Sequence, residues 1–269
     1  LWTGHFSNSR GCCAMFVDPE YLSPVYFDSF WKEIFLGGCQ NSSLAINSAV
    51  ENDQRLQMGV AKIMHAIYFG EAAALWGDIP CRETFNIMKY PNPKFDLQKQ
   101  VFEDVQMLLT EAIENLKNAY VASVYGPPVF VPNEASWVEI AHSLKARYSL
   151  ISKDYEKALT EAKLGISSPA GNLLSSHRDE EGAKNLYYQF VVEQRSGVIG
   201  PSHSHLVQLM NGEIARELET PGDAMRYNFY FETIGSNLEL NASSGGIFAA
   251  NASFPIISWT ETRLIEAEA

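Results

Sequence analysis

Carboxylates are the most abundant groups in this 269-residue chain that could do chemistry. The chain carries 32 Asp and Glu against 20 Lys and Arg, a formal net charge of −12, and two carboxylates on either side of a glycosidic bond can hydrolyse it. Most acidic residues, such as Glu103, Asp104 and Glu111, fall on the polar side of predicted amphipathic helices, where a solvated surface is their ordinary role. The sequence has no nucleophile-elbow, zinc-protease or Walker motif. We therefore predict no catalytic residue and expect that the protein is not an enzyme.

Histidine spacing gives two candidates for a metal site. Glu139 and His142 have the Glu-x-x-His spacing of di-iron helical bundles, but that chemistry needs a second copy, and no other histidine has a glutamate three residues before it. His203 and His205 could present two imidazoles on one side of an extended segment, but no third ligand is identifiable. We therefore predict no metal and no cofactor, with His142 on the polar face of its helix.

Aromatic residues outside the predicted helices give the better functional signal. A sugar ring stacks its apolar C–H face on an aromatic plane, while its hydroxyls form hydrogen bonds with Asn, Asp and Arg side chains. The candidate ligand-binding residues are Trp2, Asn8, Arg10, Tyr188, Arg195, Tyr227, Tyr230, Asn237 and Phe248. Packing in a core is the alternative role for each single aromatic. The tryptophans that fall at helix faces or starts, and that we assign to packing, are Trp31, Trp76, Trp137 and Trp259.

Two amphipathic helices are predicted on either side of a connector that contains prolines. The first helix ends near Trp76, because Pro80 follows, and proline lacks the backbone N–H and disfavours helix in the residue before it. The second has apolar residues at helical spacing over 101–116, with Asp96 as its N-cap. Each helix has one apolar face, so the pair needs neighbours to cover it.

The tetrapeptide Ser-Trp-x-Glu occurs twice, at 136–139 and 258–261, and predicts a capping box in which the serine caps the helix and the glutamate turns back to the cap. After the first copy we expect a helix, a short turn and a second helix capped by Asp154. Such a unit is close to the roughly 34-residue tetratricopeptide repeat. The second copy begins a further helix that runs to Ala269.

The segment 168–257 interrupts this helical pattern. It is rich in Gly, Ser, Asn and aromatic residues, and only 205–210 predicts a short helix. Irregular segments of this length inside a compact array are usually functional. We expect the ligand on the surface made by residues 1–12 and 187–250.

The order and spacing of five segments resemble those of a known family. The segments are LWGDIP (75–80), PKFDLQKQVFEDV (93–105), SWVEIAHSLKARYSL (136–150), DAMRY (223–227) and FPIISWTETRLIEAEA (254–269). With this set, the chain resembles the SusD/RagB-like nutrient-binding lipoproteins of Gram-negative outer membranes. The resemblance covers most of the chain from about residue 50 onward and matches Asp223 and Arg226 to a family element that we expect to form a structural ion pair.

The resemblance implies an all-α fold, a tetratricopeptide-like helical-hairpin array with a long irregular insertion that forms the ligand-binding face. We expect 1–269 to be a single domain fragment with helix pairs at about 51–118 and 136–167, the insertion at about 168–257, and the start of a further repeat at 258–269. The family's signal peptide, lipid-accepting cysteine and next helix do not occur in this sequence, so we expect an internal fragment of a longer protein.

The resemblance also implies a function. It is that of a non-catalytic cell-surface protein, which captures a glycan or other oligomeric nutrient and passes it to a TonB-dependent, SusC-like outer-membrane transporter. Its place would be the extracellular face of the outer membrane, with membrane contact only through a lipid anchor outside this segment. Because the chain is acidic and lacks a Lys/Arg cluster, we expect neither nucleic acid nor an anionic lipid surface as its main partner.

Two other classes of protein remain open. A tetratricopeptide adaptor would bind a peptide in its concave groove, and it should show regular repeats without a long interruption. A helical glycoside hydrolase would need two carboxylates across its site and should release products from a polysaccharide.

Overall fold

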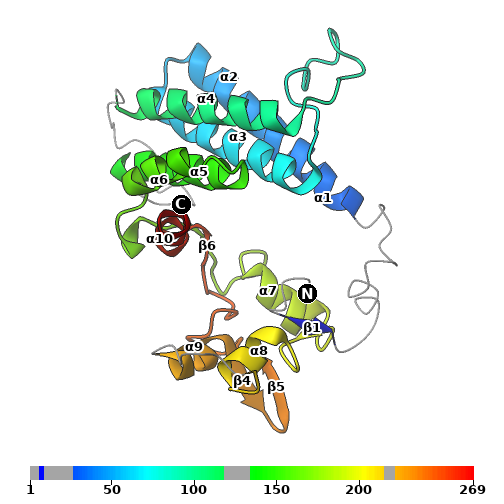
Figure 1. Cartoon of the computed structure of the whole chain (residues 1–269). Helices are drawn as coiled ribbons and strands as arrows, with labels where there is room; N and C mark the ends of the chain where they lie inside the picture. Colours follow the sequence, from blue (N-terminus) through cyan, green and yellow to red (C-terminus); the bar gives the residue numbers. More distant parts are fainter. Residues whose placement is uncertain (1–5, 9–26, 118–133, 215–221) are drawn as a thin grey trace. The chain divides into compact units, whose positions relative to one another are not determined.

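The computed structural model describes residues 6–8, 27–117, 134–214 and 222–269, and it divides into two compact units (Figure 1). The helical unit comprises residues 27–174 and 255–269, and the insertion unit comprises residues 1–26 and 175–254. The chain therefore leaves the helical unit after Leu174 and returns to it at Pro255.

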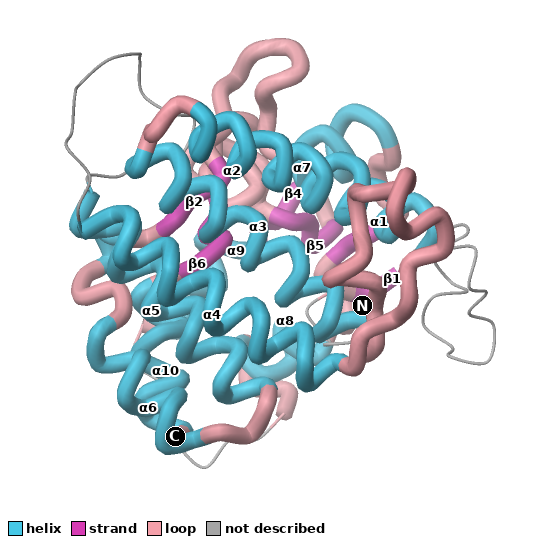
Figure 2. Tube along the Cα trace, turned by 90° about the horizontal axis from the view of Figure 1, so that it is seen from above, coloured by secondary structure: helices cyan, strands magenta, loops and turns pink. Residues whose placement is uncertain are grey.

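Helices make up most of the helical unit. Their bounds are Asp28–Lys32 (α1), Glu33–Gln40 (a π-helix), Asn41–Glu51 (α2), Arg55–Trp76 (α3), Gln98–Lys117 (α4), Glu134–Ile151 (α5), Tyr155–Leu164 (α6) and Trp259–Glu268 (α10). A 3₁₀ turn lies at Pro169–Gly171, and the strands Leu173–Ser175 (β2) and Phe254–Ile257 (β6) pair with each other. Successive helices from α2 to α6 pack side by side, and α10 packs on α5 and α6 (Figure 2). The predicted all-α array of helix pairs is confirmed.

Short elements make up the described part of the insertion unit. Their bounds are Ser7–Asn8 (β1), Leu186–Tyr188 (α7), Gln189–Gln194 (a π-helix), Ile199–Gly200 (β3), His205–Met210 (α8), Asp223–Tyr230 (α9), Phe231–Ile234 (β4) and Asn237–Leu240 (β5). β1 pairs with β3 and β4 pairs with β5, both antiparallel, with Phe231 opposite Leu240. The short helix predicted at 205–210 is confirmed as α8. The expectation that the rest of the segment is irregular is wrong, because α7, the π-helix and α9 also lie in it, and Tyr188, Tyr227 and Tyr230 are therefore helical residues.

Local sequence signals fix several helix ends. α3 ends at Trp76, as the following proline predicted. The Asp154 side chain accepts a hydrogen bond from the backbone N–H of Lys157 at the start of α6 (3.2 Å), and the Ser258 side chain accepts one from Glu261 at the start of α10 (3.0 Å). Both predicted caps are therefore confirmed.

One apolar core joins α3, α4 and α5. The side chains of these helices that are fully buried in it include Ile63, Ala66, Ala72, Val101, Leu109, Ala112, Ile140, Leu144 and Tyr148. The Tyr148 ring lies against Gly70 of α3, where a Cβ would collide with the phenol. Glycine therefore lets α3 and α5 approach closely enough to bury the whole tyrosine.

The four tryptophans assigned to packing all contact this core. Trp137 is buried in it, while Trp31, Trp76 and Trp259 pack against its edge. The ring centroids of Trp31 and Trp76 lie 5.0 Å apart in an edge-on arrangement, a favourable geometry for two aromatic rings. The packing assignment of these residues is therefore confirmed.

The prediction that Asp96 caps α4 is wrong. Its Oδ2 atom accepts hydrogen bonds from the backbone N–H groups of Cys81 (3.0 Å) and Arg82 (2.8 Å), inside the connector between α3 and α4. The N–H of Gln98, at the start of α4, donates instead to Asp78 Oδ1 (2.8 Å). The reason is that the connector folds back on itself through a bridge between Ile79 and Asp96, which places the Asp96 carboxylate beside the connector's own backbone.

The prediction that each Ser-Trp-x-Glu glutamate turns back to its cap is also wrong. The Glu261 carboxylate accepts hydrogen bonds from Arg147, and the Glu139 carboxylate accepts them from the backbone N–H (3.3 Å) and hydroxyl (2.8 Å) of Ser167. Each glutamate therefore binds a donor from another segment of the chain, the Arg147 guanidinium for Glu261 and Ser167 for Glu139. Each thereby links its helix to that segment. α5 begins at Glu134, before Ser136, so the predicted helix start at this serine is wrong; the Ser136 side chain itself lies outside the described residues.

Arg147 of α5 joins three helices and a strand. Its Nε and Nη2 atoms donate to the two carboxylate oxygens of Glu261 on α10 (2.5 and 2.6 Å), and Nη1 donates to Glu71 on α3 (3.0 Å). Nη2 also donates to the carbonyl oxygen of Ile256 in β6 (3.0 Å). The Arg147 side chain is 17% exposed, so these charge-assisted bonds lie largely away from water.

His65 of α3 is held in its neutral form. Burial lowers the pKa of this imidazole from 6.5 to about 4, although a hydrogen bond to the Cys39 backbone acts in the opposite direction. Its Nδ1 atom lies 2.8 Å from the Ser42 hydroxyl, and its ring packs edge-on against Phe69. The folded protein therefore resists protonation of a group that the unfolded chain protonates readily.

We expect Arg147→Met to destabilise the helical unit by about 2 kcal/mol. The substitution leaves Glu71 and Glu261 without their cation, but about a third of each glutamate side chain is exposed, so the loss should fall below the roughly 3–5 kcal/mol of a fully buried pair. Arg55→Met is the matched control, because Arg55 forms an exposed, 4.0 Å pair with Asp53, and it should change stability by less than about 0.5 kcal/mol. Urea denaturation measures both, and equal losses would contradict the role given to Arg147.

We expect the stability that His65 contributes to depend on pH. Because its folded pKa of about 4 lies below the unfolded value of 6.5, this contribution is fully present above about pH 6.5 and is lost as the pH falls towards 4. Between pH 7 and pH 4.5 the wild type should therefore lose about 2 kcal/mol more stability than His65→Gln. Denaturation at both pH values measures the free energy of unfolding of the two proteins, and the other titrating groups cancel in their difference. If the free energy of unfolding changed equally with pH in both, this linkage would be refuted.

Candidate functional site

Aromatic rings from distant parts of the chain gather in the insertion unit. We name this set the aromatic cluster, and it consists of Phe6, Tyr187, Tyr230, Phe231, Phe248 and Phe254. The Tyr187 ring lies edge-on to Phe248 (5.4 Å between centroids) and to Phe254 (5.8 Å), and Phe6 lies 6.1 Å from both Tyr187 and Phe248. Edge-on and tilted pairs at these distances are favourable, so the rings hold one another in place.

A small hollow opens among these rings. Its volume is about 170 Å³, and it is lined by Phe6, Leu206, Tyr230, Phe231 and Phe248. Phe231 and Phe248 are buried and Tyr230 is half-buried. Apolar cavities of about 150 Å³ hold a benzene-sized group, so this hollow suits one apolar group or the apolar face of one small ring.

Asn185 holds two segments of the aromatic cluster together. Its side chain is completely buried, and Oδ1 accepts hydrogen bonds from the N–H groups of Tyr187 (2.8 Å) and Tyr188 (3.3 Å). Its Nδ2 donates to the Ala252 carbonyl (2.7 Å) and its backbone N–H to the Ala250 carbonyl (2.8 Å). Asn185 therefore caps α7 and ties it to the turn that follows Phe248.

Glu232 of β4 fixes the loop on the other side of Phe248. Its two carboxylate oxygens accept hydrogen bonds from the Ala242 N–H (2.9 Å) and the Ser243 hydroxyl (2.6 Å). The Phe248 N–H donates to the Asn241 carbonyl (3.1 Å). The hollow is therefore built on a loop held by hydrogen bonds at both ends.

Three of the predicted ligand-binding residues lie close together. Tyr230 and Phe248 line the hollow, and Tyr227 packs against the same core with its ring edge-on to Phe231 (5.2 Å). Tyr188 lies beside the cluster on α7, where the Lys184 ammonium sits 5.4 Å from the centre of its ring. The structure therefore brings the tyrosines of α7 and α9 into the same unit, and their role in binding stays a prediction.

The other predicted residues are more scattered. Arg195 is exposed at the end of the second π-helix, and Asn237 is exposed at the start of β5, opposite Ile234. The backbone of Asn8 pairs with Ile199, while its side chain lies outside the described residues. Trp2 and Arg10 also lie outside them.

Sequence reasoning missed several residues of the site. Tyr187 is 43% exposed and Phe229 is 44% exposed, so both present more aromatic surface than Phe248, which is 8% exposed. Both lie next to predicted ligand-binding residues, Tyr188 and Tyr230. The richness of this segment in aromatic residues applied equally to them. For Asn185 the signal was its position before a short helix, which is typical of an N-cap.

The ion pair predicted within the insertion is present. Arg226 Nη2 lies 2.6 Å from Asp223 Oδ1, one turn apart on α9. This pair stabilises the first turn of the helix that carries Tyr227 and Tyr230.

The helical unit has a separate, larger hollow along α4 and the turn between α5 and α6. Its volume is about 800 Å³. Its charged lining residues are Lys99, Glu103, Glu111, Lys153, Asp154 and Lys157. Three cations and three anions balance, so the hollow has no net attraction for a charged peptide.

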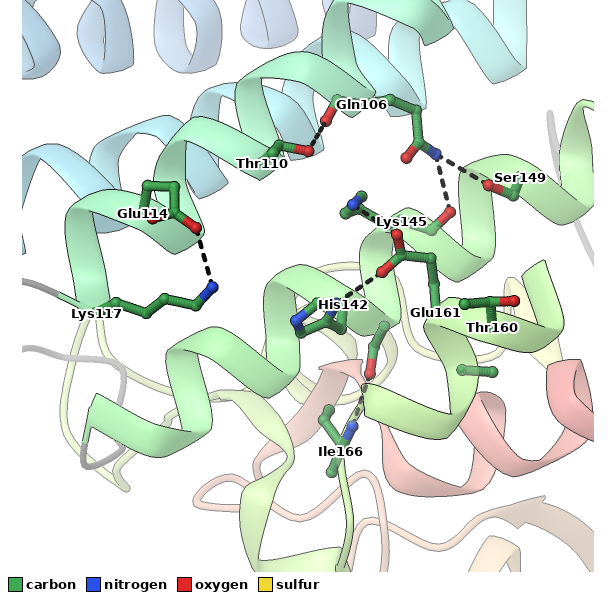
Figure 3. A network of polar contacts seen from close by, with 12 residues as sticks. Gln106, Thr110, Glu114, Lys117, His142, Lys145, Ser149, Thr160, Glu161 and Ile166 are labelled. Carbon is green, nitrogen blue, oxygen red and sulfur yellow. Dashed lines mark hydrogen bonds and ion pairs between the residues drawn. The ribbon is translucent and has the colours of Figure 1, made fainter. Parts of the chain in front are cut away.

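Polar side chains beside this hollow bind one another (Figure 3). The Glu161 carboxylate lies 2.7 Å from His142 Nδ1 and 2.6 Å from Lys145 Nζ, and Gln106 Nε2 donates to the Lys145 carbonyl (2.9 Å). Burial acts to raise the pKa of Glu161, but the hydrogen bonds from His142 and Lys145 outweigh it and lower this pKa. His142 therefore pairs with a glutamate of α6 and not with Glu139 on its own helix.

Two further observations concern metal sites and membrane-spanning helices among the described residues. None of their His, Cys, Asp and Glu side chains form a group of three or more that could hold a metal ion. Within the same ranges, no helix has the length and apolar character needed to span a bilayer.

We expect Asn185→Ala to loosen the aromatic cluster. The substitution removes the cap of α7 and leaves two N–H groups and a carbonyl without their partner, at a cost of about 2–3 kcal/mol. Asn211→Ala is the matched control, because Asn211 is an exposed asparagine of the same unit that bonds to Glu213. Hydrogen–deuterium exchange should accelerate in 186–188 and 250–252 for Asn185→Ala alone, and similar exchange in both variants would contradict this role.

A family model described as "Starch-binding associating with outer membrane" matches residues 20–190 of the chain. Two solved structures are similar over 99–100% of it: a SusD/RagB family protein from Bacteroides thetaiotaomicron (19% identity, TM-score 0.75) and a chitin-binding SusD homologue from Flavobacterium johnsoniae (14% identity, TM-score 0.79). A further chitin-binding protein matches with 19% identity and a TM-score of 0.72. At these identities the likeness establishes the fold, and the chain spans 59–63% of the length of the three structures. No curated protein matches significantly.

Proposed function

Because this chain belongs to the SusD-like family, whose description is starch-binding and associating with the outer membrane, we propose that it binds a glycan through the aromatic cluster of its insertion unit. The protein of which it is part captures that glycan at the cell surface and does not cleave it. The glycan then passes to a TonB-dependent, SusC-like transporter, and a lipid anchor outside residues 1–269 holds the protein on the extracellular face of the outer membrane.

The observation that carries the proposal is the hollow of about 170 Å³ with aromatic walls. Sugars offer apolar C–H faces and, in chitin-type polymers, acetamido methyl groups, and both gain from burial against aromatic rings. Tyr187 and Phe229 add exposed rings in the same unit, on which neighbouring sugar rings of an oligomer could stack. Two of the similar structures are described as chitin-binding, which makes chitin-type oligomers the first ligands to test.

Two carboxylates of the insertion unit have structural roles, which favours binding over hydrolysis. Glu232 is occupied by the Ala242 N–H and the Ser243 hydroxyl, and Asp223 pairs with Arg226. A hydrolase needs two carboxylates facing each other across the sugar. These two carboxylates instead hold the loop and the helix that carry the aromatic rings.

The helical unit acts as a rigid frame in this proposal. Its core residues pack along consecutive helices, and repeat arrays of this kind tolerate insertions on one face that carry a variable binding surface. The transporter contact and the lipid anchor rest on family membership alone, and both belong to the longer protein.

We expect weak binding, with a dissociation constant of about 10–1000 μM, equivalent to roughly 4–7 kcal/mol, because stacking offsets the loss of sugar hydration only in part. Trp2→Ala, Tyr187→Ala and Tyr230→Ala should each weaken binding by about tenfold or more. Tyr155→Ala is the matched control, since Tyr155 is a similarly exposed tyrosine of the helical unit, and it should leave affinity unchanged. Calorimetry against chito- and malto-oligosaccharides measures these values.

Circular dichroism of each variant separates lost binding from lost folding. Unchanged affinity in all three site variants would place the ligand elsewhere. Release of shorter oligosaccharides in the same samples would show a glycoside hydrolase.

A further inference from the structure

The connector between α3 and α4, residues 77–97, is a fixed loop that projects from the helical unit. Figure 1 shows it as the teal loop that extends beyond the ends of α3 and α4. Its two ends are joined by the bridge between Ile79 and Asp96 and by the hydrogen bonds of the Asp96 carboxylate to Cys81 and Arg82. The Arg82 guanidinium in turn binds both oxygens of Asp104 on α4 (2.6 and 2.9 Å).

Further hydrogen bonds hold the outer part of this loop. The Glu83 carboxylate accepts from the Lys94 N–H (2.9 Å), which ties one side of the loop to the other. The Asn86 side chain and carbonyl accept from the N–H groups of Lys89 (3.2 Å) and Tyr90 (2.7 Å), which closes a tight turn at the tip. The loop is therefore shaped before it meets any partner.

This turn presents apolar side chains to water. Met88 is 93% exposed and Ile87 is 75% exposed, and Phe85 and Phe95 on the two sides of the loop are exposed as well. At the base, the Phe95 ring stacks on Trp31 (6.4 Å between centroids). Large apolar side chains held together at the end of an ordered loop are typical of an interaction site.

The outer part of the loop carries only positive charge, although over the whole loop Arg82, Lys89 and Lys94 balance Asp78, Glu83 and Asp96. Residues 84–95 contain two lysines, Lys89 and Lys94, and no acidic residue, whereas the whole chain has a net charge of −12. The Lys89 ammonium lies 4.9 Å from the centre of the Tyr90 ring. An apolar tip with lysine and tyrosine directly behind it is the arrangement of segments that enter a membrane interface, where these side chains reach the headgroups.

A lipid surface fits this tip better than a protein surface does. A standard protein interface takes about 20–30 residues on each side, whereas the exposed large apolar side chains of this loop are Phe85, Ile87, Met88, Phe95 and Leu97.

We propose that the connector loop contacts an anionic lipid surface, with Ile87 and Met88 entering the boundary between headgroups and acyl chains and with Lys89 and Lys94 facing lipid phosphates. This contact adds to the lipid anchor proposed for the longer protein. It differs from two expectations, that an anionic lipid surface is not a main partner and that membrane contact is made only through a lipid anchor outside residues 1–269. It involves no residue of the aromatic cluster and does not depend on glycan binding.

Vesicle flotation of the 269-residue chain tests the proposal. The wild type should bind vesicles of mixed phosphatidylglycerol and phosphatidylcholine. Its affinity should be about tenfold lower for vesicles of phosphatidylcholine alone, or for the mixed vesicles at high salt. The double variant Ile87→Ser/Met88→Ser should bind the mixed vesicles about tenfold or more weakly. Its matched control is Leu44→Ser/Met107→Ser, which removes two exposed apolar side chains from α2 and α4 and should bind like the wild type.

The lysines are tested in the same way. Lys89→Gln/Lys94→Gln should reduce binding to the mixed vesicles by about tenfold, and Lys99→Gln/Lys163→Gln, which neutralises two exposed lysines elsewhere, should leave it unchanged. A melting curve for each variant confirms that it folds.

Two results would overturn the proposal. One is a wild type that does not float with anionic vesicles. The other is an Ile87→Ser/Met88→Ser variant that floats as well as the wild type, and if that variant also lost attachment to a purified outer-membrane protein, the tip would be a protein contact instead.

Discussion

The ion-pair network of Arg147 is the interaction on which the arrangement of the helical unit depends. The chain leaves this unit after β2 and returns in β6, and the returning helix α10 must find its place against α5 and α6. Arg147 sets that place, because its planar guanidinium binds Glu261 through two bonds and the β6 backbone through another. Ser143 of α5 adds a second link, since its hydroxyl accepts from Thr262 of α10 (2.9 Å) and from the N–H of Ile166 (2.9 Å). Two polar positions on α5 thus allow a long insertion without loss of the array.

In the insertion unit, too, a buried side chain with all its hydrogen-bond partners fixes the arrangement of the segments around it, but this side chain is neutral. Asn185 is fully buried, and its side-chain oxygen and nitrogen and its backbone N–H are all hydrogen-bonded, to α7 or to the turn that follows Phe248. A buried amide without these partners would cost more than it contributes, so it specifies one arrangement of the loops. This is how a region with few regular elements can still present a defined set of rings. Rigid loops also lower the entropy cost of binding a flexible oligomer.

The two apolar features of the molecule differ in a way that suits different partners. The aromatic cluster surrounds a hollow, and its rings Phe231 and Phe248 are buried, so it accepts a small group into a recess. The connector loop projects, and the side chains of Ile87 and Met88 are 75% and 93% exposed to solvent. Such a loop can insert into a deformable surface or into a recess of a partner. A recess with aromatic walls suits a sugar, and a convex tip with lysines behind it suits a lipid surface. Both rest on backbone that hydrogen bonds hold in one shape.

The sequence by itself determined the features that depend on neighbouring residues. Helical periodicity and Pro80 were enough for the end of α3, and the side chains of Asp154 and Ser258 were enough for two helix starts, because each acts within one turn of its own position. Composition was enough to direct attention to Tyr230 and Phe248, although Tyr230 was expected outside any helix and lies at the end of α9. Only the tertiary structure decided where Asp96, Glu139 and Glu261 find their donors, since each carboxylate binds a segment that folding brings beside it. It also decided that Tyr187 is exposed while Phe248 is buried, because that difference depends on how α7 packs against a turn about sixty residues later, a distance over which no local pattern carries information.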